Sequence, residues 1–152
     1  TAYDIMPSLV GSEMCIRDSF STFLKGSKNM GEIIKKNFDS PDESREPTDN
    51  VKVALVDLGS VKIAKMTAQP GWKWSEHIKP IVGTESCQAG HVGVVIKGEM
   101  KVKHDDGTED YFKVGDAYYL APGHDGWIVS DDEFISYEFT SDQKDFGPWK
   151  KN

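Results

Sequence analysis

Gly115-Asp-Ala-Tyr-Tyr-Leu-Ala-Pro-Gly-His-Asp-Gly-Trp127 joins two turn signals to a short run of strand-forming residues. A Gly-Asp pair opens the stretch, the Pro122-Gly123 break places His124, and a new β-type run follows at Trp127. Tyr118 and its neighbours favour a β-strand, whereas glycine and proline mark turns. The stretch therefore predicts two short strands separated by a tight turn that carries a histidine.

The same alternation of short strands and turns continues on both sides of this stretch. Strand signals recur at residues 51–58, 61–67, 72–79, 91–97, 100–104, 109–113, 117–120, 127–130 and 133–140. No segment has a convincing helical period. Such a series of about nine short strands predicts an all-β domain, either a double-sheet jelly roll or a related barrel.

The composition fits one water-exposed domain and excludes some partners. The chain has 152 residues, 38% of them hydrophobic, which is enough for one core and too few for two ordinary domains. Mean hydropathy is −0.51, and no apolar run approaches the roughly 18 residues of a membrane span. The net charge of −7 argues against nucleic acid and anionic membranes, because both select a basic face. Two cysteines cannot form a disulfide scaffold, so we expect a cytoplasmic protein.

We divide the chain into four parts. Residues 1–29 sustain no period, and residues 3–19 resemble translated sequencing-adaptor read-through, so we expect a non-native or disordered leader and leave it out of the functional reasoning. Residues 30–50 are charged and broken by proline, and we expect them to form a loop that covers the barrel. The barrel itself is assigned to residues 51–140, and residues 141–152 to a polar tail.

Gly71, His77, Lys79, His91 and Gly98 form a motif that resembles the first motif of the cupin superfamily, a group of small jelly-roll barrels. That motif has a glycine, five residues, His-x-His, three or four residues, a glutamate, six residues and a glycine. Here Gly71 is followed after five residues by His77, and Lys79 stands at the position of the second histidine. After an enlarged loop, His91 stands at the position of the glutamate, six residues before Gly98. The resemblance implies the cupin fold, a double-stranded jelly-roll β-barrel.

A second motif, downstream, resembles the other cupin signature less closely. The cupin pattern is a glycine, five residues, Pro-x-Gly, two residues, a histidine, three residues and an asparagine. Here Gly115 is followed after five residues by Ala121-Pro-Gly, with Gly126 at the histidine position and Ser130 at the asparagine position. His124 lies two residues earlier than the pattern implies.

The metal site that the resemblance implies is incomplete. Only His77 of the four usual cupin ligands is in place, which leaves open a rearranged site of His77, His91 and His124. Strand alternation would turn His77 and His91 into the barrel, while His124 lies on a turn at its mouth. Neutral imidazoles suit zinc, copper, nickel and iron(II), so we expect a divalent metal ion; interior histidines without a metal are the alternative. Cys87 and Glu85, in the enlarged loop, are the less favoured ligands.

Four further residues are expected at the pocket. Gly93 would leave room for a ligand beside His91. Tyr118 and Trp127 either line the pocket or pack in the core. Lys79 would favour an anionic ligand if it points inward, and otherwise reaches solvent because Pro80 turns the chain.

Trp72 and Trp74 alternate with His77 along the strand predicted for residues 72–79. They should therefore point away from the cavity. An outer stripe of two tryptophans needs a cover, so we expect a homodimer.

Two functions follow from the sequence. The first is a small cupin protein that binds a divalent metal and a small polar metabolite in the barrel, with metal-dependent oxygenases and isomerases as candidate classes. The alternative is a metal-free cupin that binds a small molecule as a sensor, without catalysis. Cupins include isomerases, dioxygenases, decarboxylases and sensors, so the sequence does not decide whether this protein is an enzyme.

Overall fold

The computed structural model describes residues 33–141, which contain nine strands and two short helices. The strands are β1 (Glu43–Thr48), β2 (Val51–Asp57), β3 (Val61–Ala68), β4 (His91–Lys97), β5 (Glu99–His104), β6 (Glu109–Lys113), β7 (Ala117–Leu120), β8 (His124–Ile128) and β9 (Phe134–Ser141). The helices α2 (Trp74–His77) and α3 (Lys79–Val82) lie between β3 and β4 in the chain. The predicted leader and all but the first residue of the predicted tail fall outside the described residues.

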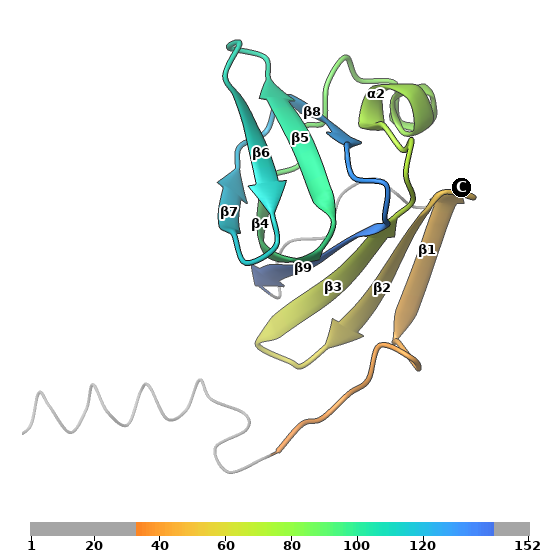
Figure 1. Cartoon of the computed structure of the whole chain (residues 1–152). Helices are drawn as coiled ribbons and strands as arrows, with labels where there is room; N and C mark the ends of the chain where they lie inside the picture. Colours follow the sequence, from red (N-terminus) through yellow and green to blue (C-terminus); the bar gives the residue numbers. More distant parts are fainter. Residues whose placement is uncertain (1–32, 142–152) are drawn as a thin grey trace, which may run out of the picture. The chain divides into compact units, whose positions relative to one another are not determined.

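The strands form two antiparallel sheets around one core (Figure 1). The larger sheet has the strand order β1-β2-β3-β9-β4-β7, and the smaller has the order β6-β5-β8. Buried side chains from both sheets, from α2 and from the loop before β4 form a single apolar cluster. The fold class is therefore all-β, as the strand series predicts.

Alternating burial explains the register of the larger sheet. In β3, Ala64, Met66 and Ala68 are buried, and the residues between them are less so. The neighbouring strand β9 buries Phe134 and Ser136. Since every second side chain of a strand points to the same face, residue 138 of β9 also faces the interior. The sheet thereby directs a glutamate toward the core.

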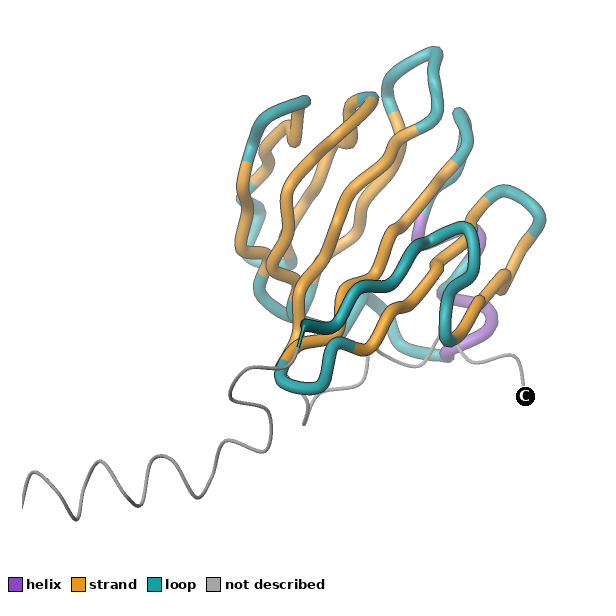
Figure 2. The backbone as a smooth tube through the Cα atoms, turned by 90° about the horizontal axis from the view of Figure 1, so that it is seen from below, coloured by secondary structure: helices purple, strands orange, loops and turns teal. Residues whose placement is uncertain are grey.

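The loop predicted for residues 30–50 is wrong at Glu43–Thr48, which pairs with β2 as the edge strand β1. This strand contains charged residues and Pro47, which are tolerated at the edge of a sheet but are not typical strand signals. Its composition therefore did not predict a strand. Ahead of β1, the chain runs across the outer face of the larger sheet (Figure 2). There the ring of Phe38 lies 5.2 Å from the ring of Tyr137.

The strand predicted for residues 72–79 is also wrong, because the chain turns into α2 and α3 there. Pro80 lies in the first turn of α3, where its fixed φ suits a helix and its missing N–H is not needed. Gly83 ends α3 in the left-handed conformation, with φ of 76°. The prediction that the chain has no helix was wrong. It gave more weight to the strand-like alternation of Trp72 and Trp74 than to the helix signals of Pro80 and Gly83.

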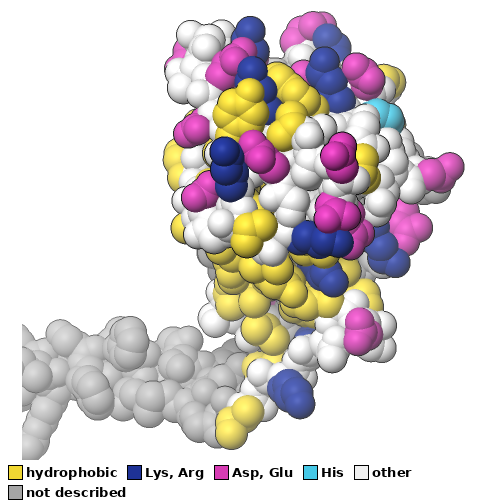
Figure 3. All heavy atoms as spheres, viewed as in Figure 1, with side chains coloured by type: hydrophobic (Ala, Val, Ile, Leu, Met, Phe, Trp, Pro, Cys, Tyr) yellow, Lys and Arg dark blue, Asp and Glu magenta, His cyan; other side chains and the backbone are white. Residues whose placement is uncertain are grey.

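Figure 3 shows one face of the molecule, on which acidic and basic side chains are interspersed. Ion pairs among the described residues include Lys101 with Glu109 at 2.8 Å and Lys52 with Glu46 at 2.9 Å. Within residues 33–141, no helix combines the length and the apolar character needed to cross a bilayer. The exclusion of nucleic acid and membrane partners stays a prediction.

Candidate metal centre

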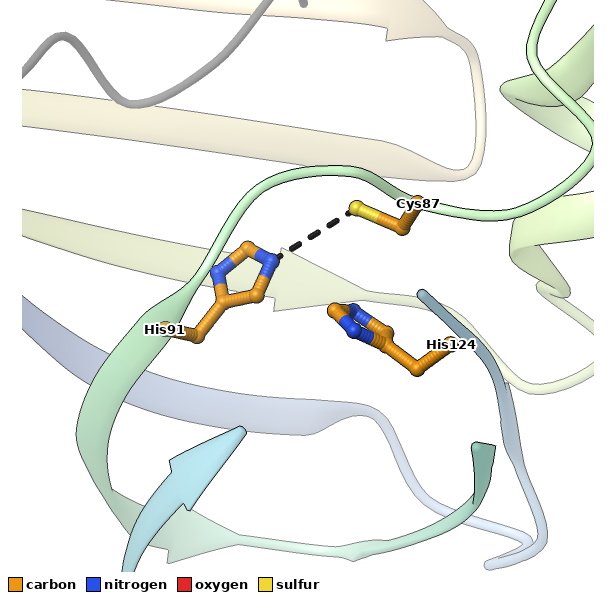
Figure 4. A group of neighbouring side chains, drawn as sticks. All are labelled: Cys87, His91 and His124. Carbon is orange, nitrogen blue, oxygen red and sulfur yellow. Dashed lines mark hydrogen bonds between the residues drawn. The ribbon is translucent and has the colours of Figure 1, made fainter. Parts of the chain in front are cut away.

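Three side chains that could bind a metal converge inside the barrel (Figure 4). Cys87 lies in the loop before β4, His91 is the first residue of β4, and His124 is the first residue of β8. One ligand atom from each lies within 4.8 Å of the other two. Cys87 Sγ is 3.7 Å from His91 Nε2, and the two imidazole rings meet edge to face with centroids 5.2 Å apart. We call these three residues the Cys-His-His group.

Backbone hydrogen bonds hold the cysteine loop against the start of β8. The Cys87 N–H donates to the carbonyl of His124 at 2.8 Å, and the Gly123 N–H donates to the carbonyl of Cys87 at 2.7 Å. On the other side of the loop, Ser86 Oγ donates to Asp105 Oδ2 at 2.6 Å. Two of the three candidate ligands are therefore positioned by the main chain itself.

Each histidine of the group has its second ring nitrogen engaged elsewhere. His91 Nδ1 lies 2.8 Å from Glu138 Oε2, and His124 Nδ1 lies 2.7 Å from the carbonyl oxygen of Ala121. Both oxygens are acceptors, so each Nδ1 carries a proton and donates it. This leaves Nε2 of each ring as the ligand atom. Histidines that bind metals are commonly oriented by such a hydrogen bond from the other nitrogen.

Glu138 connects the Cys-His-His group to β7. Its Oε1 accepts a hydrogen bond from the Tyr118 hydroxyl at 3.0 Å, while its Oε2 faces His91. Gly93 lies between these residues, opposite Glu138 on one side and opposite Tyr118 on the other. A Cβ on Gly93 would stand 2.7 Å from the Tyr118 hydroxyl oxygen and 2.6 Å from the carbonyl oxygen of Tyr137. Glycine is required because the Tyr118 side chain and the Tyr137 carbonyl fill the space beside it.

The buried groups of the site stabilise one another in their charged forms. Burial by itself lowers the pKa of His91, but the Glu138 carboxylate and Cys87 outweigh it and raise that pKa to about 10. Burial by itself raises the pKa of Cys87, but hydrogen bonds from His124 and His91 outweigh it and lower that pKa to about 6. Burial likewise opposes ionisation of Glu138, yet the charge of His91 holds its pKa below the usual value. The site therefore offers a thiolate at neutral pH, the form of cysteine that binds metals.

The Cys-His-His group borders a cavity of about 40 Å³ inside the barrel. A single water molecule needs at least roughly 10–15 Å³, so the cavity has room for a small ligand. Its walls are largely apolar and include Met66, Trp72, Trp74, Met100 and Phe112. The polar wall is formed by the Cys-His-His group with Tyr118 and Glu138. A small polar ligand would thus meet the candidate metal in a mostly dry environment.

Three predicted site residues lie away from this cavity: His77 and Lys79 because α2 and α3 replace the expected strand, and Glu85 because its loop side chain is exposed. His77 is on α2, and its Nδ1 lies 2.9 Å from the carbonyl oxygen of Lys73, so it does not share the cavity with His91. Lys79 and Glu85 pair with each other, with Nζ 2.6 Å from Oε2. The Glu85 side chain is 93% exposed, so its predicted ligand role does not fit the structure. The Lys79 side chain is 37% exposed, which fits the alternative that Pro80 turns it toward solvent and not the inward orientation.

Trp127 also lies outside the cavity, because it alternates with the inward residues of β8. Its ring faces the ammonium groups of Lys73 and Lys101, at 5.4 Å and 5.6 Å from the ring centroid. The predicted residues that the structure does bring together are His91, His124, Cys87 and Tyr118. Gly93 does not line the cavity, and Tyr118 fills the space that was expected to hold a ligand beside it.

Trp72 and Trp74 were expected on the outer surface and are instead buried, each with 3% exposure, in the wall of the cavity. The turn into α2 breaks the strand alternation on which the outward orientation depended. The predicted homodimer loses this support and stays a prediction.

Glu138 is a site residue that the sequence analysis missed. Phe134, Ser136 and Glu138 share one face of the strand predicted for residues 133–140. A carboxylate on the same face as a core phenylalanine needs a partner, because an unpaired buried charge is costly. That pattern could have indicated a buried ion pair with one of the interior histidines.

The donor set fits a divalent transition metal. In a tetrahedral zinc site, metal–sulfur and metal–nitrogen distances of about 2.3 Å and 2.0–2.1 Å place the two donors about 3.5 Å apart. Cys87 Sγ and His91 Nε2 are already 3.7 Å apart. One thiolate with two imidazoles suits zinc, iron(II), cobalt(II) or nickel(II), and not magnesium or calcium. Three protein ligands leave a coordination position open, as in catalytic zinc sites.

Several solved structures have a similar fold. A protein of unknown function from Rhizobium leguminosarum aligns with a TM-score of 0.52 and 18% identity, over 72% of this chain and 98% of that chain. AerE from Microcystis aeruginosa aligns with a TM-score of 0.50 and 11% identity, over 67% of this chain, which spans only 46% of AerE. An RmlC-like cupin from Shewanella frigidimarina aligns with a TM-score of 0.48 and 18% identity, over 74% of this chain and 94% of that chain.

No family model and no curated protein matches the chain. Similarity at such low identity shows the fold alone. The described residues have the cupin-type double-stranded jelly-roll fold, as the two sequence motifs imply.

Proposed function

We propose that this protein binds one divalent transition metal through Cys87 Sγ, His91 Nε2 and His124 Nε2, and binds a small polar molecule beside it in the barrel. The observation that supports this proposal most strongly is the convergence of three ligand atoms within 4.8 Å of one another. The hydrogen bonds at the two Nδ1 atoms add to it, because they leave the correct nitrogen of each ring for a metal.

The residues around the metal would have distinct roles. A bound metal would supply a Lewis acid that polarises an oxygen of the small molecule. Glu138 orients His91 and balances the positive charge of the centre. Tyr118 holds the second oxygen of Glu138 in place. The apolar wall excludes water, which strengthens these interactions. Metal-dependent oxygenases and isomerases are the enzyme classes that we propose to screen.

A metal-free binding protein is the second candidate function, and one observation favours it. Cys87, His91, Glu138 and Tyr118 already form a continuous chain of polar contacts of 3.7, 2.8 and 3.0 Å. The raised pKa of His91 and the lowered pKa of Cys87 describe an imidazolium–thiolate pair that is satisfied without a metal. In this case, the same residues would bind a small metabolite by hydrogen bonds, as in a sensor.

Elemental analysis of the purified chain, after reconstitution with zinc, iron(II) and cobalt(II) in turn, distinguishes the metal-binding function from the metal-free one. We expect close to one metal per chain in the parent and in His77→Ala, which alters a histidine outside the cavity. His91→Ala and His124→Ala should each lose the metal while remaining folded by circular dichroism. A parent that takes up no metal would exclude the first proposal and favour the metal-free one. Loss of metal from His77→Ala alone would show that the ligands are assigned wrongly.

A further inference from the structure

A groove that is open to solvent lies between β6 and β7 (Figure 1). β6 is the last strand of the smaller sheet and β7 the last strand of the larger one, so the two sheets meet here at unpaired edges. The groove has a volume of about 340 Å³. Binding sites for small molecules typically occupy about 300–1,000 Å³. The groove is therefore large enough for a ligand that does not fit the inner cavity of about 40 Å³.

Three apolar side chains, Val102, Phe112 and Leu120, line both the groove and the inner cavity and so form a wall between them. The ring of Phe112 on β6 stacks on the ring of Tyr118 on β7, with centroids 4.5 Å apart and planes inclined by 19°. This stack joins the two sheet edges and holds the wall in place. On the solvent side, Tyr119 also lines the groove and is 72% exposed. The groove thus offers an apolar wall and an accessible aromatic ring.

The charged side chains that line the groove are acidic. Three carboxylates line it, and no lysine or arginine among residues 33–141 does. Two of the carboxylates have basic partners: Glu109 Oε2 lies 2.8 Å from Lys101 Nζ, and Asp106 Oδ1 lies 3.4 Å from His104 Nδ1. The third, Asp110, is exposed, and its Oδ1 accepts a hydrogen bond from the next backbone N–H at 2.8 Å. In the described part of the chain no ion pair is found for Asp110, so its charge is available to a ligand.

Asp110 lies on the face of the β5–β6 hairpin that otherwise carries apolar side chains. Its register partner on β5 is Val102, which is buried, and Phe112 follows two residues later on the same face of β6. Lys101 and Lys103 alternate with Val102 along β5 and therefore lie on the opposite face of the hairpin. An inward charge on an edge strand can also prevent pairing with another chain, which is the alternative explanation for Asp110.

We propose that the groove binds a small organic ammonium ion, whose apolar body packs on Val102, Phe112 and Leu120 and whose ammonium group lies beside Asp110 and Tyr119. A carboxylate forms charge-assisted hydrogen bonds with an ammonium group, and an aromatic face attracts a cation. A neutral ligand would gain the apolar contacts alone, and an anion would meet an unpaired carboxylate. This site goes beyond the proposed function, because it lies outside the inner cavity and needs no metal.

Nuclear magnetic resonance titration of the full chain, with a metal chelator present, tests the proposal. The probes share a phenyl ring and a short linker and differ in charge: 2-phenylethylamine, 2-phenylethanol and 3-phenylpropionate. We expect the amine to bind about two- to fivefold more tightly than the alcohol, the range for a partly exposed ion pair, and the carboxylate to bind most weakly. The amide signals of Asp110, Phe112 and Tyr119 should shift, and that of His77, outside the groove, should not. In about 1 M salt the preference for the amine should disappear.

Asp110→Asn removes the charge and keeps the shape of the side chain. It should lower the affinity for 2-phenylethylamine to that for 2-phenylethanol. Asp131→Asn is the matched control, because it removes the same charge from an exposed position outside the groove and should leave the amine affinity unchanged. Equal binding of amine and alcohol to the parent, or an unchanged amine affinity in Asp110→Asn, would overturn the proposal and leave edge protection as the role of Asp110. Shifts confined to residues outside the groove would overturn it as well. Loss of metal binding at the Cys-His-His group would not affect this result.

Discussion

His91 Nδ1 and Glu138 Oε2 lie 2.8 Å apart across neighbouring strands, with only 14% and 13% of their side chains exposed. The pair joins the Cys-His-His group to β9, a strand that is distant from it in sequence. A carboxylate at Nδ1 fixes the ring and makes Nε2 a better electron donor. The pair would therefore tune a metal that neither Glu138 oxygen touches.

We predict that Glu138→Gln lowers metal affinity by about 10- to 100-fold, the range found when the hydrogen-bond partner of a metal-binding histidine is changed. Glutamine keeps the shape but loses the charge that holds His91 in position. Competition with a coloured zinc chelator measures the effect. Glu133→Gln is the control, because Glu133 pairs with Lys97 outside the cavity, at 3.3 Å. Equal affinity in both variants would show that Glu138 has no role at the metal.

Cys87→Ser should change the spectrum of the bound metal as well as its affinity. Serine has a similar size but does not offer a thiolate, the softest donor of the group. We expect cobalt(II) bound to the parent to show thiolate-to-cobalt charge-transfer absorption and Cys87→Ser to lack it. Cys15→Ser, which alters the other cysteine of the sequence, should keep the band. A parent spectrum without the band would mean that Cys87 is not a ligand.

Much of the barrel could be predicted from the sequence because antiparallel strands leave a local signal. Alternation and turn residues are properties of a few neighbouring residues, and they located eight of the nine strands. The bounds of β8 were wrong, because it begins at His124, which was predicted on a turn, and ends at Ile128 instead of residue 130. The missed strand β1 is an edge strand filled by charges and a proline. The strand prediction for residues 72–79 was wrong for the opposite reason. Trp72 and Trp74 alternate as in a strand, although Pro80 and Gly83 mark the start and the end of a helical turn there.

The site was harder to predict because its members meet only through the fold. The cupin register placed His77 in the barrel, and that placement depended on a strand that does not form. Cys87 reaches the site because its loop pairs with His124, a contact between residues far apart in the sequence that no local pattern reveals. Glu138 is brought in by the β4–β9 ladder, which sequence alone does not define.

The thiol of Cys87 should ionise well below its ordinary range in the metal-free protein. Its pKa of about 6 results from hydrogen bonds to His124 and His91, which outweigh burial. In a Cys15→Ser background with a chelator present, absorbance of the thiolate at short ultraviolet wavelengths should rise through pH about 6. His124→Ala should move this midpoint upward, whereas His77→Ala should leave it unchanged.

The same shift has a consequence for stability. The pKa of Cys87 is lower in the folded state than the ordinary cysteine value of 9.0. Ionisation of Cys87 therefore stabilises the fold fully above pH about 9, and that contribution is lost as pH falls through about 6. Cys87→Ser should flatten this part of the dependence of the unfolding free energy on pH. A midpoint near the ordinary cysteine value would contradict the hydrogen bonds described for the site.

Gly93→Ala should destabilise the fold, because the new methyl group has no room. Its position lies 2.6 Å from the Tyr137 carbonyl oxygen and 2.7 Å from the Tyr118 hydroxyl oxygen. Relieving the clash would require Tyr118 to move from Glu138 or β4 to move from β9. Such overpacking costs about 1–3 kcal/mol, measurable by urea unfolding. Metal affinity should fall with it, since Tyr118 holds the glutamate that orients His91.

Gly90→Ala is the matched control for this prediction. It lies one residue before β4, and a Cβ there would meet only ordinary contacts, the nearest being Pro122 Cδ at 3.6 Å. Gly90 is also outside the left-handed region, so alanine adds no backbone strain and removes flexibility from the unfolded chain. The free energy of unfolding should thus be unchanged or slightly higher for Gly90→Ala. If the two variants unfold alike, the close packing of Tyr118 against Gly93 is not what holds Glu138 beside His91.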